Sequence, residues 1–267
     1  MKNDASREPE AGVAELKTLF GCIDNTTLHG NDTHETVRKL CEESLCMIDE
    51  LRGIPPVAAV CVYPTYVRYA ASLLKGSGIK VAAVAGGFPS AHMKLEVKRY
   101  EVEQALADGA DEIDTVFNRA ALLEGDSTKA YDEVATLKEC CGQRTLKVIL
   151  ETGDLPTTQH IEQAAALAIE GGADFIKTST GKTAVGATPQ AAQAMLKAIE
   201  KAYEKEKKQV GFKAAGGIAT LDDALTYFRL ARQTMGKRAL SNQNFRIGSS
   251  RLTRLLFEHL TRHATSI

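Results

Sequence analysis

The chain has 267 residues, of which 44% are hydrophobic and 25% are charged, and its formal net charge is −1. This length suits either one (β/α)₈ barrel or two smaller domains. The near-zero charge gives no reason to expect binding to nucleic acid or to a membrane surface, so any anion site has to be local.

The N-terminal residues and the cysteines indicate the domain organisation and the compartment to expect. Residues Met1–Glu10 are polar and lack the apolar core of a signal peptide, so we expect a loose tail followed by one domain over residues 11–267. No stretch approaches the length of a membrane span. The six cysteines form no C-x-x-C pair, and no cysteine or histidine shows zinc-site spacing. We therefore expect reduced thiols in a cytoplasmic protein without a bound metal.

Short apolar runs alternate with helix-like segments along the whole chain. The runs that we interpret as strands are Phe20–Asp24, Val57–Tyr63, Lys80–Gly86, Glu112–Phe117, Lys147–Glu151, Phe175–Ser179, Gly211–Ala215 and Phe245–Gly248. They recur roughly every 25–35 residues, as successive β-α units do in a closed barrel. Near-continuous apolar runs are typical of parallel strands that are covered on both faces. The pattern predicts an α/β protein with a single-domain (β/α)₈ TIM barrel.

Helix signals lie between these strands. The segment His160–Ile169 ends at a glycine pair, which is a common helix stop. Thr188 and Thr220 each precede a helical segment and are predicted N-caps, with Pro189 in the first turn after Thr188. An open doubly wound sheet is the alternative fold. It would place a glycine-rich dinucleotide turn after the first strand, and Asp24–Leu28 is not such a turn.

Two lysines interrupt two of the apolar strands. Lys177 lies in the middle of Asp174–Thr180, and Lys213 has the corresponding place in Val210–Gly216. A buried ammonium group is costly unless it is paired or gives up its proton. Two neighbouring cations disfavour each other's charged form, and desolvation acts in the same direction. Such an arrangement can hold one amine neutral at physiological pH, and a neutral lysine amine attacks carbonyls to form a Schiff base.

Other polar groups lie at the carboxyl ends of the predicted strands, where α/β barrels carry their reacting groups. The first strand leads to Asp24 and Thr26, the second carries Cys61, and the fourth carries Asp114. A carboxylate inside an apolar strand needs a partner. Asp114 is therefore expected to be a structural ion-pair partner of a lysine, a proton shuttle beside the amine, or both.

Three glycine-containing loops follow the sixth, seventh and eighth predicted strands. They read Thr180-Gly181-Lys182, Ala215-Gly216-Gly217 and Gly248-Ser249-Ser250. Glycines allow backbone N–H groups to converge, helix N-termini attract anions, and the last two loops are the usual phosphate position in this architecture. Ordinary tight turns are the alternative, but they leave Lys182 unexplained. We predict an anion site here.

With these motifs the chain resembles the deoxyribose-phosphate aldolase family, which are Schiff-base aldolases on a (β/α)₈ barrel. The resemblance runs from Ile23–Leu28 to the last helix. Its most specific motifs are Val60–Pro64, Gly109–Asp114, Phe175–Lys182, Lys213–Gly217 and Phe245–Ser250.

The resemblance implies a role for each site residue. Lys177 would form the Schiff base, Lys213 would perturb it, and Asp114 would transfer protons. The implied phosphate site consists of Gly181, Lys182, Gly216, Gly217, Gly248, Ser249 and Ser250. Asp24 and Thr26 would belong to the substrate and proton-relay environment. Cys61 would line the pocket, with a packing role as the alternative.

The implied reaction is the reversible cleavage of 2-deoxy-D-ribose 5-phosphate into D-glyceraldehyde 3-phosphate and acetaldehyde, without a cofactor. The partner would be a small phosphorylated sugar, and the family implies a homodimer. Two other functions stay open: another Schiff-base aldolase or a transaldolase on the same barrel, and a phosphosugar-binding barrel that has lost catalysis.

The chain departs from the family pattern at two places. Arg251 follows the two serines where some relatives have a small residue, which either weakens the last phosphate contact or adds a cation. The chain ends at Thr265–Ile267, so we expect the contribution of the terminal tyrosine that assists proton transfer in some members to be absent or supplied otherwise.

Overall fold

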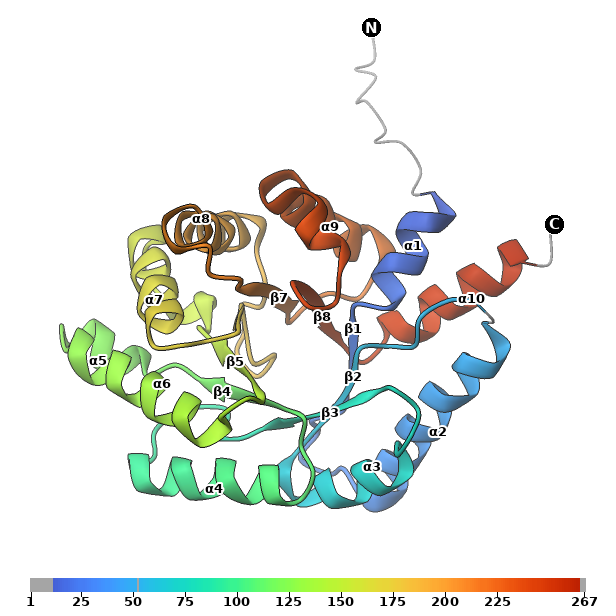
Figure 1. The fold of residues 1–267 in the computed structure, drawn as a ribbon, viewed down its shortest axis with the longest axis horizontal. Coiled ribbons are helices and arrows are strands. Elements are labelled where there is room, and N and C mark those ends of the chain that lie inside the picture. Colours follow the sequence, from blue (N-terminus) through green and yellow to red (C-terminus); the bar gives the residue numbers. More distant parts are fainter. Residues whose placement is uncertain (1–11, 52, 265–267) are drawn as a thin grey trace, which may run out of the picture.

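Eight parallel strands form a closed barrel in which each strand pairs with the next and β8 pairs with β1 (Figure 1). The computed structural model describes residues 12–51 and 53–264, so the predicted tail and Thr265–Ile267 lie outside the described part. The strands are β1 (Ile23–Thr26), β2 (Ala59–Val62), β3 (Lys80–Val84), β4 (Glu112–Val116), β5 (Thr145–Ile149), β6 (Phe175–Lys177), β7 (Gly211–Ala215) and β8 (Phe245–Ser249). The predicted (β/α)₈ TIM barrel is confirmed.

Helices surround this barrel and connect its strands (Figure 1). The α-helices are α1 (Val13–Phe20), α2 (His34–Glu50), α3 (Val67–Leu73), α4 (Leu95–Ala107), α5 (Arg119–Leu123), α6 (Ser127–Cys141), α7 (Thr158–Glu170), α8 (Pro189–Glu206), α9 (Leu221–Met235) and α10 (Leu252–Ala264). Short 3₁₀ helices are η1 (Pro64–Tyr66), η2 (Thr152–Asp154) and η3 (Gly236–Leu240).

The predicted caps form as expected. The Thr188 hydroxyl accepts a hydrogen bond from the backbone N–H of Ala191 at 3.2 Å, and Pro189 occupies the first helical position of α8. Thr220 and Asp223 form a reciprocal capping box at the start of α9. Helix α7 ends at Glu170 and has Gly171 as its C-cap, the first residue of the predicted glycine stop.

The predicted first strand, Phe20–Asp24, was wrong at its start. Phe20 is the last residue of α1, and the strand begins at Ile23. Leu16, Leu19 and Phe20 are buried at helical spacing, and their apolar run continues into the strand without a polar break. Periodicity therefore did not separate the helix from the strand.

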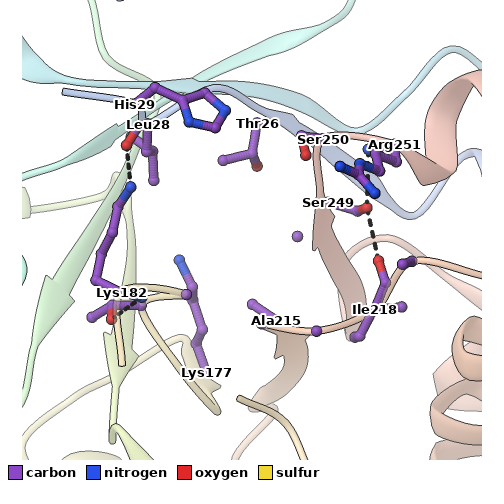
Figure 2. A pocket seen from close by; sticks show the side chains of 16 residues that line it. Thr26, Leu28, His29, Lys177, Lys182, Ala215, Ile218, Ser249, Ser250 and Arg251 are labelled. Atoms are coloured by element: carbon purple, nitrogen blue, oxygen red, sulfur yellow. Dashed lines mark hydrogen bonds between the residues drawn. The ribbon is translucent and has the colours of Figure 1, made fainter. Parts of the chain in front are cut away.

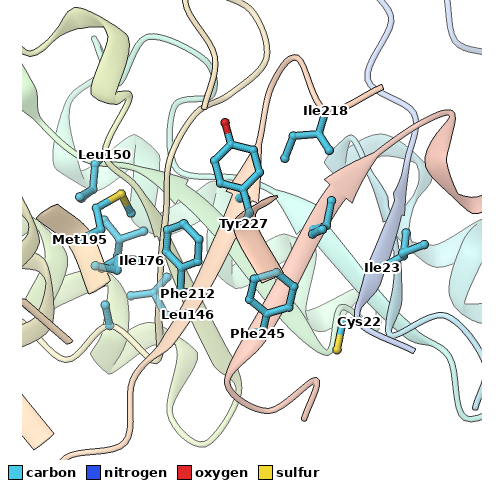
Figure 3. Close-up of a cluster of buried hydrophobic side chains, with 14 of the residues drawn as sticks. Cys22, Ile23, Leu146, Leu150, Ile176, Met195, Phe212, Ile218, Tyr227 and Phe245 are labelled. Atoms are coloured by element: carbon cyan, nitrogen blue, oxygen red, sulfur yellow. The ribbon is translucent and has the colours of Figure 1, made fainter. Parts of the chain in front are cut away.

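The outward-facing residues of the strands form the main hydrophobic core against the surrounding helices. Figure 3 shows Phe212 of β7 and Phe245 of β8 in this layer, with Tyr227 of α9 beside them. The two phenylalanine ring centroids are 6.3 Å apart. Because strand residues alternate between faces, this packing directs Lys213 and Arg246 into the barrel interior. Packing of the apolar residues against the helices thus determines that these two charged side chains point into the barrel.

Candidate active site

Lys177 and Lys213 lie side by side inside the barrel because their Cα positions are register partners in β6 and β7. The Nζ atoms of both lysines donate to the same atom, Oδ2 of Asp114 in β4, at 2.8 and 2.7 Å. Lys177 is 3% exposed, and Asp114 and Lys213 are fully buried. The structure therefore brings together the three side chains that the sequence selected as a group.

The charged network is larger than the sequence analysis predicted. Lys147 of β5 donates to Oδ1 of Asp114 at 2.8 Å and lies 2.6 Å from Oε2 of Glu112. Arg246 of β8 contacts Oδ1 of Asp24 at 2.6 Å and Oε1 of Glu112 at 2.9 Å. Lys147, Glu112 and Arg246 were missed. Each carried the signal that identified Lys177, a charged residue within an apolar strand.

The charges of this network do not balance if every group is ionised. It contains three carboxylates and four cationic side chains, namely Asp24, Glu112, Asp114, Lys147, Lys177, Lys213 and Arg246. One surplus positive charge in a buried site is unfavourable. Loss of one proton from one lysine removes the surplus.

Lys177 is the lysine placed to lose that proton. Burial lowers the pKa of Lys177, and the nearby Lys213 ammonium lowers it further, against the opposing effect of Asp114. Burial acts in the same direction on Lys213, but the carboxylates of Asp114 and Asp24 outweigh it, so the pKa of Lys213 is raised. The two neighbouring lysines thus have opposite pKa shifts, and Lys177 is the amine that becomes neutral first.

The two aspartates of the network stay ionised. Burial alone would raise the pKa of Asp114, but Lys147, Lys177 and Lys213 together hold it well below its usual range. The pKa of Asp24 is also lowered, because Lys213, Lys147 and Arg246 outweigh the effect of burial. Asp24 lies 2.5 Å from Nζ of Lys213. It therefore keeps Lys213 charged.

A pocket of about 330 Å³ opens beside Lys177 at the carboxyl end of the barrel (Figure 2). It is lined by Thr26, Leu28, His29, Lys177, Thr180, Gly181, Lys182, Ala215, Gly216, Gly217, Ile218, Ala219, Gly248, Ser249, Ser250 and Arg251. Of the seven network side chains, only Lys177 is among these lining residues, so one amine connects the buried charges to the pocket. Asp24, Asp114 and Lys213 lie beneath it.

Cys61 does not line this pocket either. It is fully buried with Leu28, Ala59, Ala82 and Val84 in a small apolar cluster. Burial raises the pKa of its thiol. This position supports the packing role that the sequence left open.

Glycines allow the loops around the pocket to approach closely. Gly216 and Gly217 have positive φ angles of 88° and 78°, which side chains rarely adopt. A Cβ atom at Gly186 would lie 2.3 Å from the carbonyl oxygen of Gly216. The loop after β6 thus packs directly on the turn after β7, and larger residues would separate the two.

The two serines after β8 have different environments. The Ser249 hydroxyl donates to the carbonyl of Ile218 at 3.0 Å and accepts from the N–H of Leu252 at 3.2 Å. It joins the start of α10 to the loop after β7. Ser250 is exposed and lines the pocket. Of the two hydroxyls, that of Ser250 is therefore free to meet a ligand.

Lys182 lies on the loop after β6, and its Nζ donates to the backbone carbonyl of Leu28. This contact joins the loop after β6 to the loop after β1. In Figure 2 Lys182 lies on one side of Lys177, with Ser249, Ser250 and Arg251 on the other.

Glu151 holds the same loop from below. It is fully buried and has a left-handed backbone with φ of 53°. Its carboxylate accepts the Thr180 N–H at 3.2 Å and the Thr183 hydroxyl at 3.2 Å, and it also accepts the Thr180 hydroxyl. Non-glycine residues in this conformation are strained and are often found at functional sites. No local sequence pattern indicates this role of Glu151.

The sequence model of the DeoC/LacD family aldolases matches residues 18–241. The chain belongs to the DeoC/LacD aldolase family. The relatives of this family member include the deoxyribose-phosphate aldolase of Bos taurus, which is 40% identical over 264 residues, covering 93% of this chain and 83% of the relative. The human deoxyribose-phosphate aldolase is 41% identical over 254 residues, covering 90% and 80% of the two chains.

A solved structure agrees with the fold of this DeoC/LacD family member. The crystal structure of a candidate deoxyribose-phosphate aldolase from Toxoplasma gondii ME49 superposes with a TM-score of 0.83 at 26% sequence identity. The match covers 94% of this chain and 96% of the other.

Two further observations describe this aldolase family member. Within residues 12–51 and 53–264, no group of three or more histidine, cysteine, aspartate or glutamate side chains is arranged to hold a metal ion. Among the described helices, none has the length and apolar character needed to span a bilayer.

Proposed function

We propose that the protein catalyses the reversible cleavage of 2-deoxy-D-ribose 5-phosphate into D-glyceraldehyde 3-phosphate and acetaldehyde through a Schiff base on Lys177. One observation carries the proposal. The Lys177 amine faces the pocket and shares a single carboxylate oxygen with the charged Lys213. Membership of an aldolase family and the names of the mammalian relatives support the reaction class and the substrate.

The first step needs a neutral amine. The Lys177 nitrogen attacks the C1 aldehyde of the open-chain sugar to give a neutral carbinolamine. Uptake of one proton by its hydroxyl and loss of water then give an iminium ion. Asp114 and Lys213 lie beneath the pocket rather than on its lining. They would therefore exchange protons with the substrate through Lys177 or through water.

The iminium then acts as an electron sink. Loss of the proton from the C3 hydroxyl allows the C2–C3 bond to break, and its electron pair moves to form the enamine. D-glyceraldehyde 3-phosphate leaves, and its aldehyde carbon is the former C3 of the sugar. Protonation of the enamine carbon and hydrolysis release acetaldehyde and return the Lys177 amine. Asp114 is bonded to both amines, and this contact lets it pass the proton between Lys177 and its partners Lys213 and water.

The phosphate would bind at the glycine-rich side of the pocket. Backbone N–H groups and the start of α10 favour an anion there. The proposed site residues are Gly181, Lys182, Gly216, Gly217, Gly248, Ser249 and Ser250, with Thr26 nearby on the lining. Ser249 would act mainly by holding the loops together. Fixing the phosphate brings the aldehyde to Lys177, which lowers the entropic cost of the reaction.

The test is reduction with borohydride in the presence of acetaldehyde, followed by peptide mapping by mass spectrometry. We expect one adduct, on Lys177, and none in Lys177→Leu. Lys197→Leu is a matched control because Lys197 is exposed on α8. Product analysis should find acetaldehyde. Transfer of a three-carbon unit without acetaldehyde would instead favour a transaldolase, and absence of any adduct would favour a binding protein.

We also propose a cytoplasmic location and a homodimer. The free state of the six cysteines supports a reducing compartment. The homodimer is proposed from the resemblance to the family alone. Cell fractionation tests the location, and light scattering on the purified protein tests the dimer.

A further inference from the structure

A phosphate dianion bound in the pocket needs a positive charge, and few lining groups can provide one. Besides the imidazole of His29, which lies next to Leu28 in Figure 2 and away from Ser249 and Ser250, three lining residues carry an amine or guanidinium group, namely Lys177, Lys182 and Arg251. Backbone N–H groups contribute partial charges only. One of these three side chains is therefore expected to be the principal phosphate cation.

The two lysines are less suited to this role. Lys177 reacts as the neutral amine, with a lowered pKa, in the proposed reaction. The ammonium of Lys182 already donates to the carbonyl of Leu28, on the other side of Lys177 from Ser249 and Ser250 (Figure 2). Phosphate binding at Lys182 would compete with that contact.

Arg251 has neither restriction. It is exposed, and its guanidinium group has no hydrogen-bond or ion-pair partner among the described residues. Figure 2 shows this group beside Ser249 and Ser250 at the edge of the pocket. The backbone N–H of Arg251 is bonded to the Ser249 hydroxyl at 3.3 Å, which fixes the position of the residue just before α10. The side chain is thus available to a ligand, and its backbone is held.

We infer that Arg251 is the principal cation that recognises the substrate phosphate and makes the enzyme selective for phosphorylated sugars. This inference rests on the proposed function. A planar guanidinium presents paired N–H donors that match two phosphate oxygens, which an ammonium cannot do. The turn at Gly216 and Gly217 and the N-terminus of α10 complete the anion site from the backbone.

The experiment compares Arg251→Leu with two controls. Arg254→Leu removes the same charge one turn further along α10, where the side chain is 75% exposed and pairs with Glu258. Arg251→Lys keeps the charge but loses the paired donors. For each protein, kcat and KM are measured with 2-deoxyribose 5-phosphate and with unphosphorylated 2-deoxyribose, and inorganic phosphate binding is measured by calorimetry.

We expect Arg251→Leu to raise KM for the phosphorylated sugar about tenfold or more, as for loss of a charge-assisted contact. KM for 2-deoxyribose should stay unchanged. Inorganic phosphate should bind correspondingly more weakly. Arg254→Leu should match the wild type, and Arg251→Lys should fall between the two. Lys182→Ala should affect phosphate less than Arg251→Leu does.

Other outcomes overturn the inference. Arg251→Leu could change neither KM nor phosphate binding, it could change KM equally for both sugars, or Lys182→Ala could cause the larger loss of phosphate binding. Calorimetry decides without turnover, so a wild type that binds phosphate through Arg251 but releases no acetaldehyde refutes only the proposed reaction. An active wild type with an unaffected Arg251→Leu variant refutes only this inference.

Discussion

Lys177 and Lys213 occupy partner positions on adjacent strands, and both donate to one oxygen of Asp114. The difference between them lies in their other contacts. Lys213 also has Asp24 at 2.5 Å, whereas Lys177 faces the pocket. The second carboxylate, Asp24, keeps Lys213 charged, whereas Lys177 has no such partner within the described part of the chain and is the reactive amine.

Replacing Lys177 with leucine should abolish turnover and leave the fold intact. The substitution replaces a buried amine with an apolar side chain that has no desolvation cost, so the melting temperature should stay constant or rise. Activity and thermal unfolding followed by circular dichroism check the two parts. Substantial residual cleavage would exclude Lys177 as the Schiff-base residue.

Replacing Lys213 with methionine should move the pH dependence of Schiff-base formation to higher pH. The change removes a cation that lowers the pKa of Lys177. It also removes the hydrogen bond from Lys213 to Asp114, so Lys177 no longer shares that carboxylate oxygen with Lys213. Both effects raise that pKa, so the amine stays protonated at neutral pH and regains reactivity as the pH increases. Initial rates of borohydride trapping from pH 6 to about 10 measure the shift. An unchanged profile would show that Lys213 does not control the Lys177 amine.

Replacing Asp114 with asparagine should destabilise the protein by about 3–5 kcal/mol, because the buried ammonium groups of Lys147 and Lys213 lose a shared anionic partner. Denaturant unfolding measures the loss. Asp132→Asn is a suitable control, because Asp132 is exposed on α6. A stability equal to that of the control would mean that the network does not depend on Asp114.

The wild type should lose stability in acid. Asp114 and Asp24 have pKa values below the ordinary value in the folded state, so the stability that they contribute is present above the unfolded-state pKa of about 3.9. It is lost progressively as the pH falls below that value toward the folded-state pKa. Melting temperatures measured between pH 7 and 2 should decline mainly below about pH 4, and Asp114→Asn should flatten that decline.

Replacing Glu151 with glutamine should raise KM for phosphorylated and free sugar alike. The amide group cannot accept all the hydrogen bonds that Thr180 and Thr183 donate, so the wall of the pocket loosens. We expect roughly a tenfold effect, larger on KM than on kcat. Steady-state kinetics with both sugars test this, and a loss confined to the phosphorylated sugar would contradict it.

The sequence predicted the parts of the molecule that follow local patterns. The barrel, the caps at Thr188 and Thr220, and the grouping of Lys177, Lys213 and Asp114 all follow from periodicity, capping chemistry and charge within apolar strands. Each of these patterns involves only a few neighbouring residues or repeats with every β-α unit, so it can be recognised in the sequence.

The missed features depend on contacts between distant parts of the chain. The bond from Lys182 to Leu28 spans 154 residues, and the bond from Arg246 to Glu112 spans 134. Neither spacing has a local pattern. Arg246 and Lys147 could have been found by applying the Lys177 criterion to every strand, whereas the partner of Lys182 could not.

Because the charged network is buried and Arg251 is exposed, ionisation of the Lys177 amine and binding of the substrate phosphate should respond differently to ionic strength. Dissolved ions screen exposed charges strongly and reach buried pairs far less. The acidity of the Lys177 amine should therefore change little as salt is added, whereas capture of a dianion at the exposed Arg251 should weaken. High salt would thus raise KM for the phosphorylated sugar and leave kcat nearly constant.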